Sequence, residues 1–258
     1  MNITFNKYQG AGNDFIIIDN RENLINPSDS ELINKLCDRR FGIGADGLIL
    51  ISNNDQSDFE MKYFNSDGFI GSMCGNGGRC TAHFALKAAI AGERQRFLAY
   101  DGIHEAYVEK NIVRLQMGNV NECRLINDNY FLNTGSPHYV VIKEDIDSID
   151  VHEEGKKLRW APEFAPGGTN VNFVQLLDKG LYIRTFERGV EDETLACGTG
   201  VTASAIASVL KGHFDTNSVN VTTRGGNLKV DFEIHDKKIT NVWLTGPATF
   251  VFTGNITV

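Results

Sequence analysis

The chain has 258 residues, of which 41% are hydrophobic and 22% are charged, a composition typical of a globular protein with one large or two ordinary domains. Its net charge of −8 argues against a surface for nucleic acid or anionic membranes, because both need clustered lysine and arginine. No apolar run reaches the ~18 residues of a membrane span, and no secretory signal is recognisable.

The cysteines are odd in number and their spacing matches no common zinc site, so we expect no metal. Without a secretory signal, free thiols in a reducing cytoplasm are expected. Three of the five are expected to be small buried hydrophobes, namely Cys37, Cys80 and Cys123. The other two, Cys74 and Cys197, each precede a glycine-rich helix start.

Taken in chain order, the elements of the two halves of the sequence resemble each other. The first half predicts a strand at 14–19, a helix at 30–39, strands at 48–52 and 59–65, a helix at 77–91 and a hairpin of 104–108 with 113–117. The second half predicts strands at 138–143, 171–177 and 181–187, a helix at 200–210 and a hairpin of 228–234 with 239–244. Residues 247–258 are strand-like and are expected to return to the first domain.

Residues 42–47 read Gly-Ile-Gly-Ala-Asp-Gly, which fits the dinucleotide pattern GxGxxG. That motif requires a strand before it and a helix after it, so that the pyrophosphate meets a helix N-terminus. Here a predicted helix comes before it and a predicted strand comes after it. The pattern therefore indicates a glycine turn, and no nucleotide cofactor is expected.

The two halves align without gaps at an offset of 123 residues. Cys74-Gly75-Asn76-Gly77 then falls on Cys197-Gly198-Thr199-Gly200, and three further stretches align in the same register. This repeat predicts an α+β fold of two pseudo-symmetric domains, 1–118 with 247–258 and 119–246. Each is expected to be a curved, mostly antiparallel sheet or barrel around a central helix, with the active site in the interdomain cleft.

Cys74 and Cys197 occupy equivalent positions of this repeat. The helix that follows each of them has no acidic residue in its first turn, so the amides at its N-terminus are available to an anion. The same field lowers the pKa of a nearby thiol. Two such thiols on opposite faces of an α-carbon, beside a bound carboxylate, are suited to racemisation by two bases without a cofactor.

The chain resembles the diaminopimelate epimerase family along nearly its whole length. The resemblance is carried by residues 10–15 (GAGNDF), 64–68 (FNSDG), 74–80 (CGNGGRC), 186–189 (FERG) and 196–200 (ACGTG). It implies interconversion of LL- and meso-2,6-diaminopimelate, a step toward lysine and peptidoglycan. It also implies no cofactor, a cytoplasmic location, a homodimer, and neither a nucleic-acid nor a membrane partner.

The resemblance also implies roles for individual residues. Cys74 corresponds to the proton donor and Cys197 to the acceptor, and these roles exchange in the reverse reaction. The amides that hold the reacting carboxylate correspond to Gly75, Asn76, Gly198 and Thr199. The distal end of the substrate is bound by residues corresponding to Asn13, Asn65, Asn170, Glu187 and Arg188. His138 and Glu187 match polar neighbours that tune the thiols.

Two positions depart from the family pattern: Gly47 stands where Gln is frequent, and Ser136 stands where Asn is usual. Water is expected in the space of the missing Gln. Three alternatives remain open. A proline or hydroxyproline racemase-type enzyme would not need Arg188 as a second carboxylate anchor, a phenazine-biosynthesis-like isomerase would lack the paired thiols, and a non-catalytic amino-acid-binding module would explain a carboxylate site but not two symmetric thiols.

Overall fold

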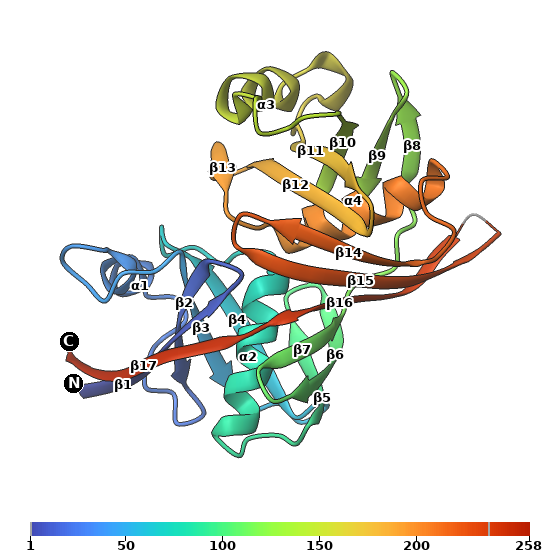
Figure 1. Cartoon of the computed structure of the whole chain (residues 1–258). Coiled ribbons are helices and arrows are strands. Elements are labelled where there is room, and N and C mark those ends of the chain that lie inside the picture. The colour runs from blue at the N-terminus through green and yellow to red at the C-terminus, as the bar shows by residue number, and fades with distance from the viewer. Residues whose placement is uncertain (1, 237) are drawn as a thin grey trace. The chain divides into compact units, whose positions relative to one another are not determined.

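The computed structural model describes residues 2–236 and 238–258, which form two compact units (Figure 1). Unit 1 contains the chain up to Leu115 together with Gly246–Val258, and unit 2 contains Gln116–Thr245. The boundaries expected from the sequence were 118 and 247. None of the helices in the described part of the chain is long and apolar enough to cross a membrane.

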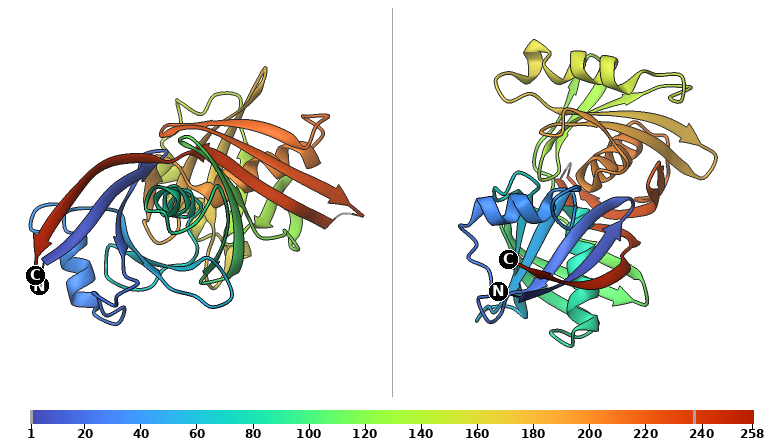
Figure 2. Two further views of the ribbon diagram at one scale, coloured as in Figure 1. Left: turned by 90° about the horizontal axis from the view of Figure 1, so that it is seen from below. Right: turned by 90° about the vertical axis from the view of Figure 1, so that its left-hand side faces the viewer.

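Unit 1 is built of strands around the helix α2, which Figure 2 (left) shows end-on. Its sheet is mixed, because β2 pairs with β3 and β4 pairs with β5 in parallel, while β1 lies antiparallel to both β2 and β17. Its elements are β1 (Asn2–Gly10), β2 (Asn13–Asp19), α1 (Ser30–Cys37), β3 (Gly47–Ser52), β4 (Phe59–Asn65), α2 (Gly75–Lys87), β5 (Arg94–Ala99), β6 (Gly102–Glu109), β7 (Ile112–Gln116) and β17 (Thr249–Thr257).

Unit 2 repeats this plan around α4, which packs against β9–β12, β14 and β15. Parallel pairs again join β10 to β11 and β12 to β14. Its elements are β8 (Cys123–Ile126), β9 (Asn129–Asn133), β10 (Pro137–Ile142), α3 (Val151–Arg159), the 3-10 turn η1 (Pro162–Phe164), β11 (Asn170–Leu177), β12 (Gly180–Glu187), β13 (Asp192–Thr194), α4 (Gly198–Leu210), β14 (Ser218–Thr223), β15 (Gly226–His235) and β16 (Lys238–Pro247), whose last residues belong to unit 1.

Strand register confirms the internal repeat. In unit 1 Ile17 lies opposite Ile49, and in unit 2 Val140 lies opposite Asn172. Each residue of the unit 2 pair lies 123 positions after its counterpart in unit 1, since 140 − 17 = 123 and 172 − 49 = 123. The sequence offset is thus a structural equivalence, and the predicted two-domain α+β fold is confirmed.

Local packing shows why these segments adopt their structures. Helix α1 begins after Asp29, whose side chain accepts a hydrogen bond from the backbone N–H of Leu32 at 3.0 Å, as helix N-caps do. It then buries Ile33 and Leu36 against strand β3. Each such side chain contributes about 1.5–3 kcal/mol to folding when fully removed from water.

The structure corrects the bounds of the three predicted helices and adds a fourth helix. The two glycine-rich helices begin at Gly75 and Gly198, two residues earlier than the sequence suggested, and α2 ends at Lys87 instead of residue 91. The helix predicted at 30–39 ends at Cys37. Helix α3, the counterpart of α1 in unit 2, was not predicted.

Candidate active site

Cys74 is the N-cap residue of α2, where its extended backbone (φ −103°, ψ 117°) turns into the helix. Its sulfur accepts a hydrogen bond from the N–H of Gly77 at 3.5 Å and lies 3.6 Å from Oδ1 of Asn13. Asn76 Nδ2 lies 3.5 Å from the same oxygen. Three of the residues singled out from the sequence are therefore brought together in unit 1. Cysteine is not among the preferred N-cap residues, yet the Cys74 sulfur caps this helix.

A network of charged side chains holds Asn13 in place. Asn13 Nδ2 donates to Asp46 at 2.6 Å, and Arg39 bridges Asp46 and Asp14 at 2.7 and 2.6 Å. Burial alone would raise the pKa of the Asp14 carboxyl, but hydrogen bonds and ion pairs with Arg39 and Lys7 lower it to about 2. The Asp14 carboxyl of this network therefore stays ionised at neutral pH.

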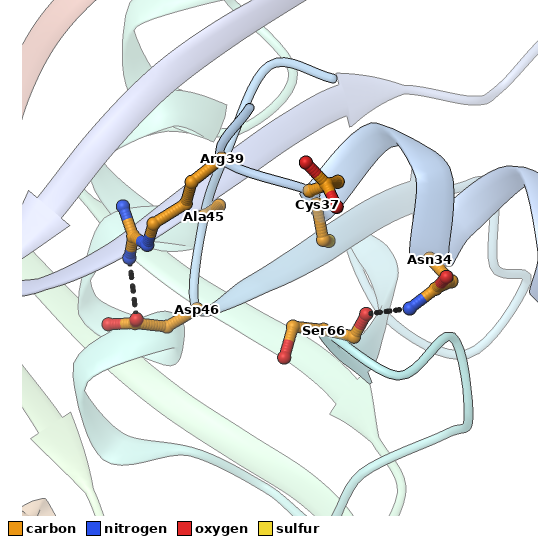
Figure 3. Close-up of a pocket in the computed structure, with 7 residues that line it drawn as sticks. Asn34, Cys37, Arg39, Ala45, Asp46 and Ser66 are labelled. Atoms are coloured by element: carbon orange, nitrogen blue, oxygen red, sulfur yellow. Dashed lines mark hydrogen bonds and ion pairs between the residues drawn. The ribbon is translucent and has the colours of Figure 1, made fainter. Parts of the chain in front are cut away.

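Two residues of this network, Arg39 and Asp46, also line a pocket of about 270 Å³ (Figure 3). In it the Arg39–Asp46 ion pair faces the Asn34 side chain, which donates to the backbone oxygen of Ser66 at 2.8 Å. Cys37 also lines it, and burial raises the pKa of its thiol to about 12, so this cysteine is protonated at neutral pH.

At Gly47, the first residue of β3, an added Cβ would lie 2.5 Å from a ring carbon of Tyr63 and 2.5 Å from the backbone oxygen of Phe64. In this structure the Tyr63 ring and the backbone leave no room for a side chain at position 47. Asn65 stands two residues beyond Tyr63 at the end of β4, exposed, where its backbone N–H donates to Phe69 O at 3.0 Å.

Arg79 lies fully buried one turn into α2, a residue whose role the sequence analysis missed. Its guanidinium donates to Gly75 O at 3.1 Å and to Asn76 Oδ1 at 2.8 Å. Burial lowers its pKa, while the nearby Cys80 and Cys74 sulfurs raise it. A buried cation thus orients Asn76 and places positive charge beside Cys74. The Gly-Gly-Arg sequence within CGNGGRC contained this residue, but only the fold shows that it points inward.

Cys197 occupies the equivalent N-cap position of α4, also in extended conformation (φ −113°, ψ 112°). Neither α2 nor α4 has an acidic residue in its first turn. The Cys197 sulfur lies 3.3 Å from Thr199 Oγ1, which lies 2.9 Å from Nε2 of His138. Thr134 Oγ1 fixes the start of the helix by donating to Thr199 O at 2.8 Å.

His138 is completely buried, and Asn172 Nδ2 lies 3.1 Å from its Nδ1. Burial lowers the pKa of His138 to about 3, with a further lowering from Arg188. The imidazole is therefore neutral at physiological pH. Asn172 was not among the predicted site residues. The structure shows that it is fully buried and that its side chain contacts His138.

The remaining predicted residues of unit 2 form a second polar cluster. Asn170 donates through Nδ2 to Ser136 Oγ at 2.8 Å, and its Oδ1 accepts from the backbone N–H of Arg188 at 2.8 Å. The Arg188 side chain is exposed and reaches Ser136 Oγ at 3.5 Å. Glu187 accepts from Thr194 Oγ1 at 2.9 Å. Ser136 thus bridges two side chains that the resemblance assigns to the distal end of the substrate.

The other cysteines differ from Cys74 and Cys197. Cys80 is fully buried and burial raises its pKa to about 12. Cys123, on β8, is only half-buried, so the expectation of a buried hydrophobe is met at Cys37 and Cys80 more closely than at Cys123. Burial also raises the pKa of Cys123, to about 11.

Comparison with known proteins places the chain in a family. Residues 5–122 and 130–251 match the family described as diaminopimelate epimerase. A protein of Flavobacterium psychrophilum named diaminopimelate epimerase is 51% identical over 95% of this chain and 97% of its own. The fold is shared with a PhzF-family phenazine biosynthesis protein of Bacillus anthracis (TM-score 0.81, 14% identity, 100% of both chains). It is also shared with a hydroxyproline epimerase of Agrobacterium vitis (TM-score 0.72, 12% identity, 99% of this chain and 92% of that one). With such identity along almost all of its length, the chain belongs to the diaminopimelate epimerase family.

Proposed function

We propose that this isomerase interconverts LL- and meso-2,6-diaminopimelate, with Cys74 and Cys197 acting as acid and base on opposite faces of the α-carbon. The observation that carries the proposal is their equivalence: each cysteine is the N-cap residue of the buried helix in one copy of the repeat. A thiolate removes the α-proton and becomes a thiol, while the opposite thiol gives its proton to the other face and becomes a thiolate. Protons balance, and no cofactor is needed.

The starts of the two helices suit the charge that develops in this reaction. Gly75 and Asn76 begin α2, and Gly198 and Thr199 begin α4, each without an acidic side chain in the first turn. The N-terminus of a helix carries about half a positive charge. Backbone amides there would bind the reacting carboxylate and stabilise the enediolate-like intermediate.

Selection of a substrate with two carboxylates rests on Arg188. Its exposed guanidinium stands beside Ser136 and Asn170, and a planar guanidinium binds carboxylate through two parallel hydrogen bonds. Asn13, Asn65 and Glu187 complete the proposed contacts to the distal amino-acid end. A proline racemase-type reaction would leave this cation without a ligand, and a non-catalytic binding module would leave the paired thiols unexplained.

The test follows α-hydrogen exchange in D2O, by proton NMR and chiral analysis, for Cys74→Ala and Cys197→Ala. Each variant should lose net epimerisation, because the inverted carbon has no proton donor on one side. Each should still exchange the α-hydrogen of the isomer that faces its remaining thiol, so the two variants should prefer opposite isomers. If both prefer the same isomer, the assignment of one thiol to each face is wrong.

We also propose that the protein is a cytoplasmic homodimer. Support for the location is chemical: the described cysteines form no disulfide, as expected in a reducing compartment. Support for the dimer comes from β17, where Phe250, Val251 and Phe252 remain 46–51% exposed in consecutive positions. Apolar surface of this kind is typical of a contact between chains. Sedimentation should give a dimer for the wild type and a lighter species for Val251→Lys; a monomeric wild type would rule the dimer out.

A further inference from the structure

A continuous chain of polar side chains leads from the interior of unit 2 to Cys197. Thr185 Oγ1 donates to Asn172 Oδ1 at 2.9 Å, Asn172 Nδ2 meets His138 Nδ1 at 3.1 Å, His138 Nε2 meets Thr199 Oγ1 at 2.9 Å, and Thr199 Oγ1 lies 3.3 Å from the sulfur. We call these five residues the Cys197 relay. Thr185, Asn172 and His138 are at most 2% exposed, so water does not compete for the hydrogen bonds among these three residues.

The direction of the hydrogen bonds follows from the inner end of the relay. Asn172 Nδ2 also faces the backbone oxygen of Tyr139 at 3.5 Å, and a carbonyl can only accept. The Thr185 hydroxyl, on the other side, donates to Oδ1. The amide group of Asn172 is thereby fixed with its nitrogen toward His138.

His138 Nδ1 must then accept, which places the proton of the neutral imidazole on Nε2. Nε2–H donates to Thr199 Oγ1, and the hydroxyl hydrogen of Thr199 is left to point at the Cys197 sulfur. A hydrogen bond donated to an ionised group favours its charged form. No proton passes along the relay; each hydrogen stays on its own atom.

The internal repeat provides a comparison within the same molecule. At the offset of 123, His138 corresponds to Phe15 and Asn172 to Ile49, both fully buried and apolar. The glycines inside the two helices reflect the difference: a Cβ at Gly200 would meet Asn172 Oδ1, whereas a Cβ at Gly77 would meet the terminal carbon of Ile49. The two buried positions that His138 and Asn172 occupy in unit 2 are thus apolar in unit 1.

We propose that Asn172 and Thr185 are positioning residues that act through His138 and Thr199 to favour the thiolate of Cys197, so that this thiol ionises more readily than it would without the relay. The inference rests on the proposed two-thiol function and adds an asymmetry to it. Arg188 is the charged side chain that acts on His138, and it opposes protonation of the ring. Its neighbour Glu187 is held by Thr194. Tyr130, on β9, bonds at the opposite end of α4, to Leu210 O.

The first experiment determines the tautomer of His138 directly in the wild-type protein, by nitrogen-15 NMR of labelled histidine. The relay requires the proton on Nε2, with Nδ1 unprotonated, from pH 8 down to about pH 5. A proton on Nδ1, or a doubly protonated ring at neutral pH, overturns the proposal whatever the variants show.

The second experiment measures how alkylation of Cys197 and of Cys74 by iodoacetamide depends on pH, with both peptides quantified by mass spectrometry. Thr199→Val should raise the midpoint for Cys197 by about one to two pH units, the size expected for a hydrogen bond to a charged group. Thr199→Ser keeps the hydroxyl and should stay close to the wild type. Thr185→Val, which touches neither thiol, should shift Cys197 in the same direction by a smaller amount, and Thr185→Ser should restore it.

Control variants separate the relay from structural damage and from the proposed function. Ile49→Val alters the equivalent position of unit 1 and should leave the midpoint of Cys197 unchanged. Loosened packing would speed alkylation at every pH without moving the midpoint. If the alkylation midpoint of Cys197 does not move in Thr199→Val, the relay is overturned, even if Cys197→Ala abolishes epimerisation. If this midpoint shifts but the wild-type protein does not epimerise diaminopimelate, the relay stands and only the proposed function is overturned.

Discussion

Acidification is expected to destabilise the protein through His138, because this ring is buried in its neutral form. The unfolded chain binds a proton on this histidine at about pH 6.5, whereas burial lowers the pKa in the folded state to about 3. Between these values the unfolded state holds more protons, so falling pH favours unfolding. The stability is fully present above about pH 6.5 and is lost as the pH falls toward 3. At 1.36 kcal/mol per unit, the loss at pH 5 is about 2 kcal/mol.

Urea unfolding of the wild type and of His138→Gln, measured from pH 7.5 to 5, tests this reasoning. His138→Gln should be less stable at pH 7.5, yet the wild type should lose about 2 kcal/mol more than the variant over this range. His213→Gln is the matched control, because His213 is an exposed histidine of the same unit, and this variant should keep the wild-type slope. Equal slopes for the wild type and His138→Gln would refute the claim that the buried ring is neutral.

Three further outcomes are expected. In urea titrations, Gly200→Ala should lower the unfolding free energy by about 1–3 kcal/mol, because its Cβ would lie 2.4 Å from Asn172 Oδ1. Gly77→Ala, at the equivalent position of unit 1, should lower it less, because its Cβ would lie 3.3–3.5 Å from its neighbours. Asp14→Asn should lower the unfolding free energy by about 1–2 kcal/mol at pH 7, a figure reduced to allow for the partial exposure of Asp14. In thermal unfolding, the stability difference between this variant and the wild type should shrink only as the pH falls below about 3.8 toward 2. Arg188→Lys should lower kcat/KM for diaminopimelate about tenfold or more, and unchanged kinetics would mean that Arg188 does not bind the distal carboxylate.

Features set by local sequence could be predicted, and those set by tertiary contacts could not. The repeat located both thiols and both buried helices, yet each helix was placed two residues late because glycine has low helix propensity. Helix α3 was missed because Gly155 interrupts a short, highly charged segment. The structure explains this glycine, since a Cβ there would lie 2.4 Å from Phe186. Its cap, Asp150, accepting from Glu153 N at 3.1 Å, was a signal that could have revealed it.

The same distinction holds at the site. Asn13 and Asn76 stand in motifs, and these two residues and His138 were predicted from the resemblance. Asn172 sits in an ordinary strand pattern, and its importance depends on the pairing of β10 with β11, which brings it beside His138 from 34 residues away. Long-range strand pairing of this kind leaves no local sequence signal.

The return of β17 to pair with β1 has a consequence for how the chain is made. Unit 1 is interrupted after Leu115 and resumes only at Gly246, so the ribosome synthesises all of unit 2 before the last strand of unit 1 emerges. Unit 2 is continuous and can fold as soon as it leaves the exit tunnel, as domains generally do during translation. Until β17 is made, the edge of β1 that pairs with it has no partner strand. Such an edge invites association with other nascent chains, so a chaperone that covers β1 would act during this interval.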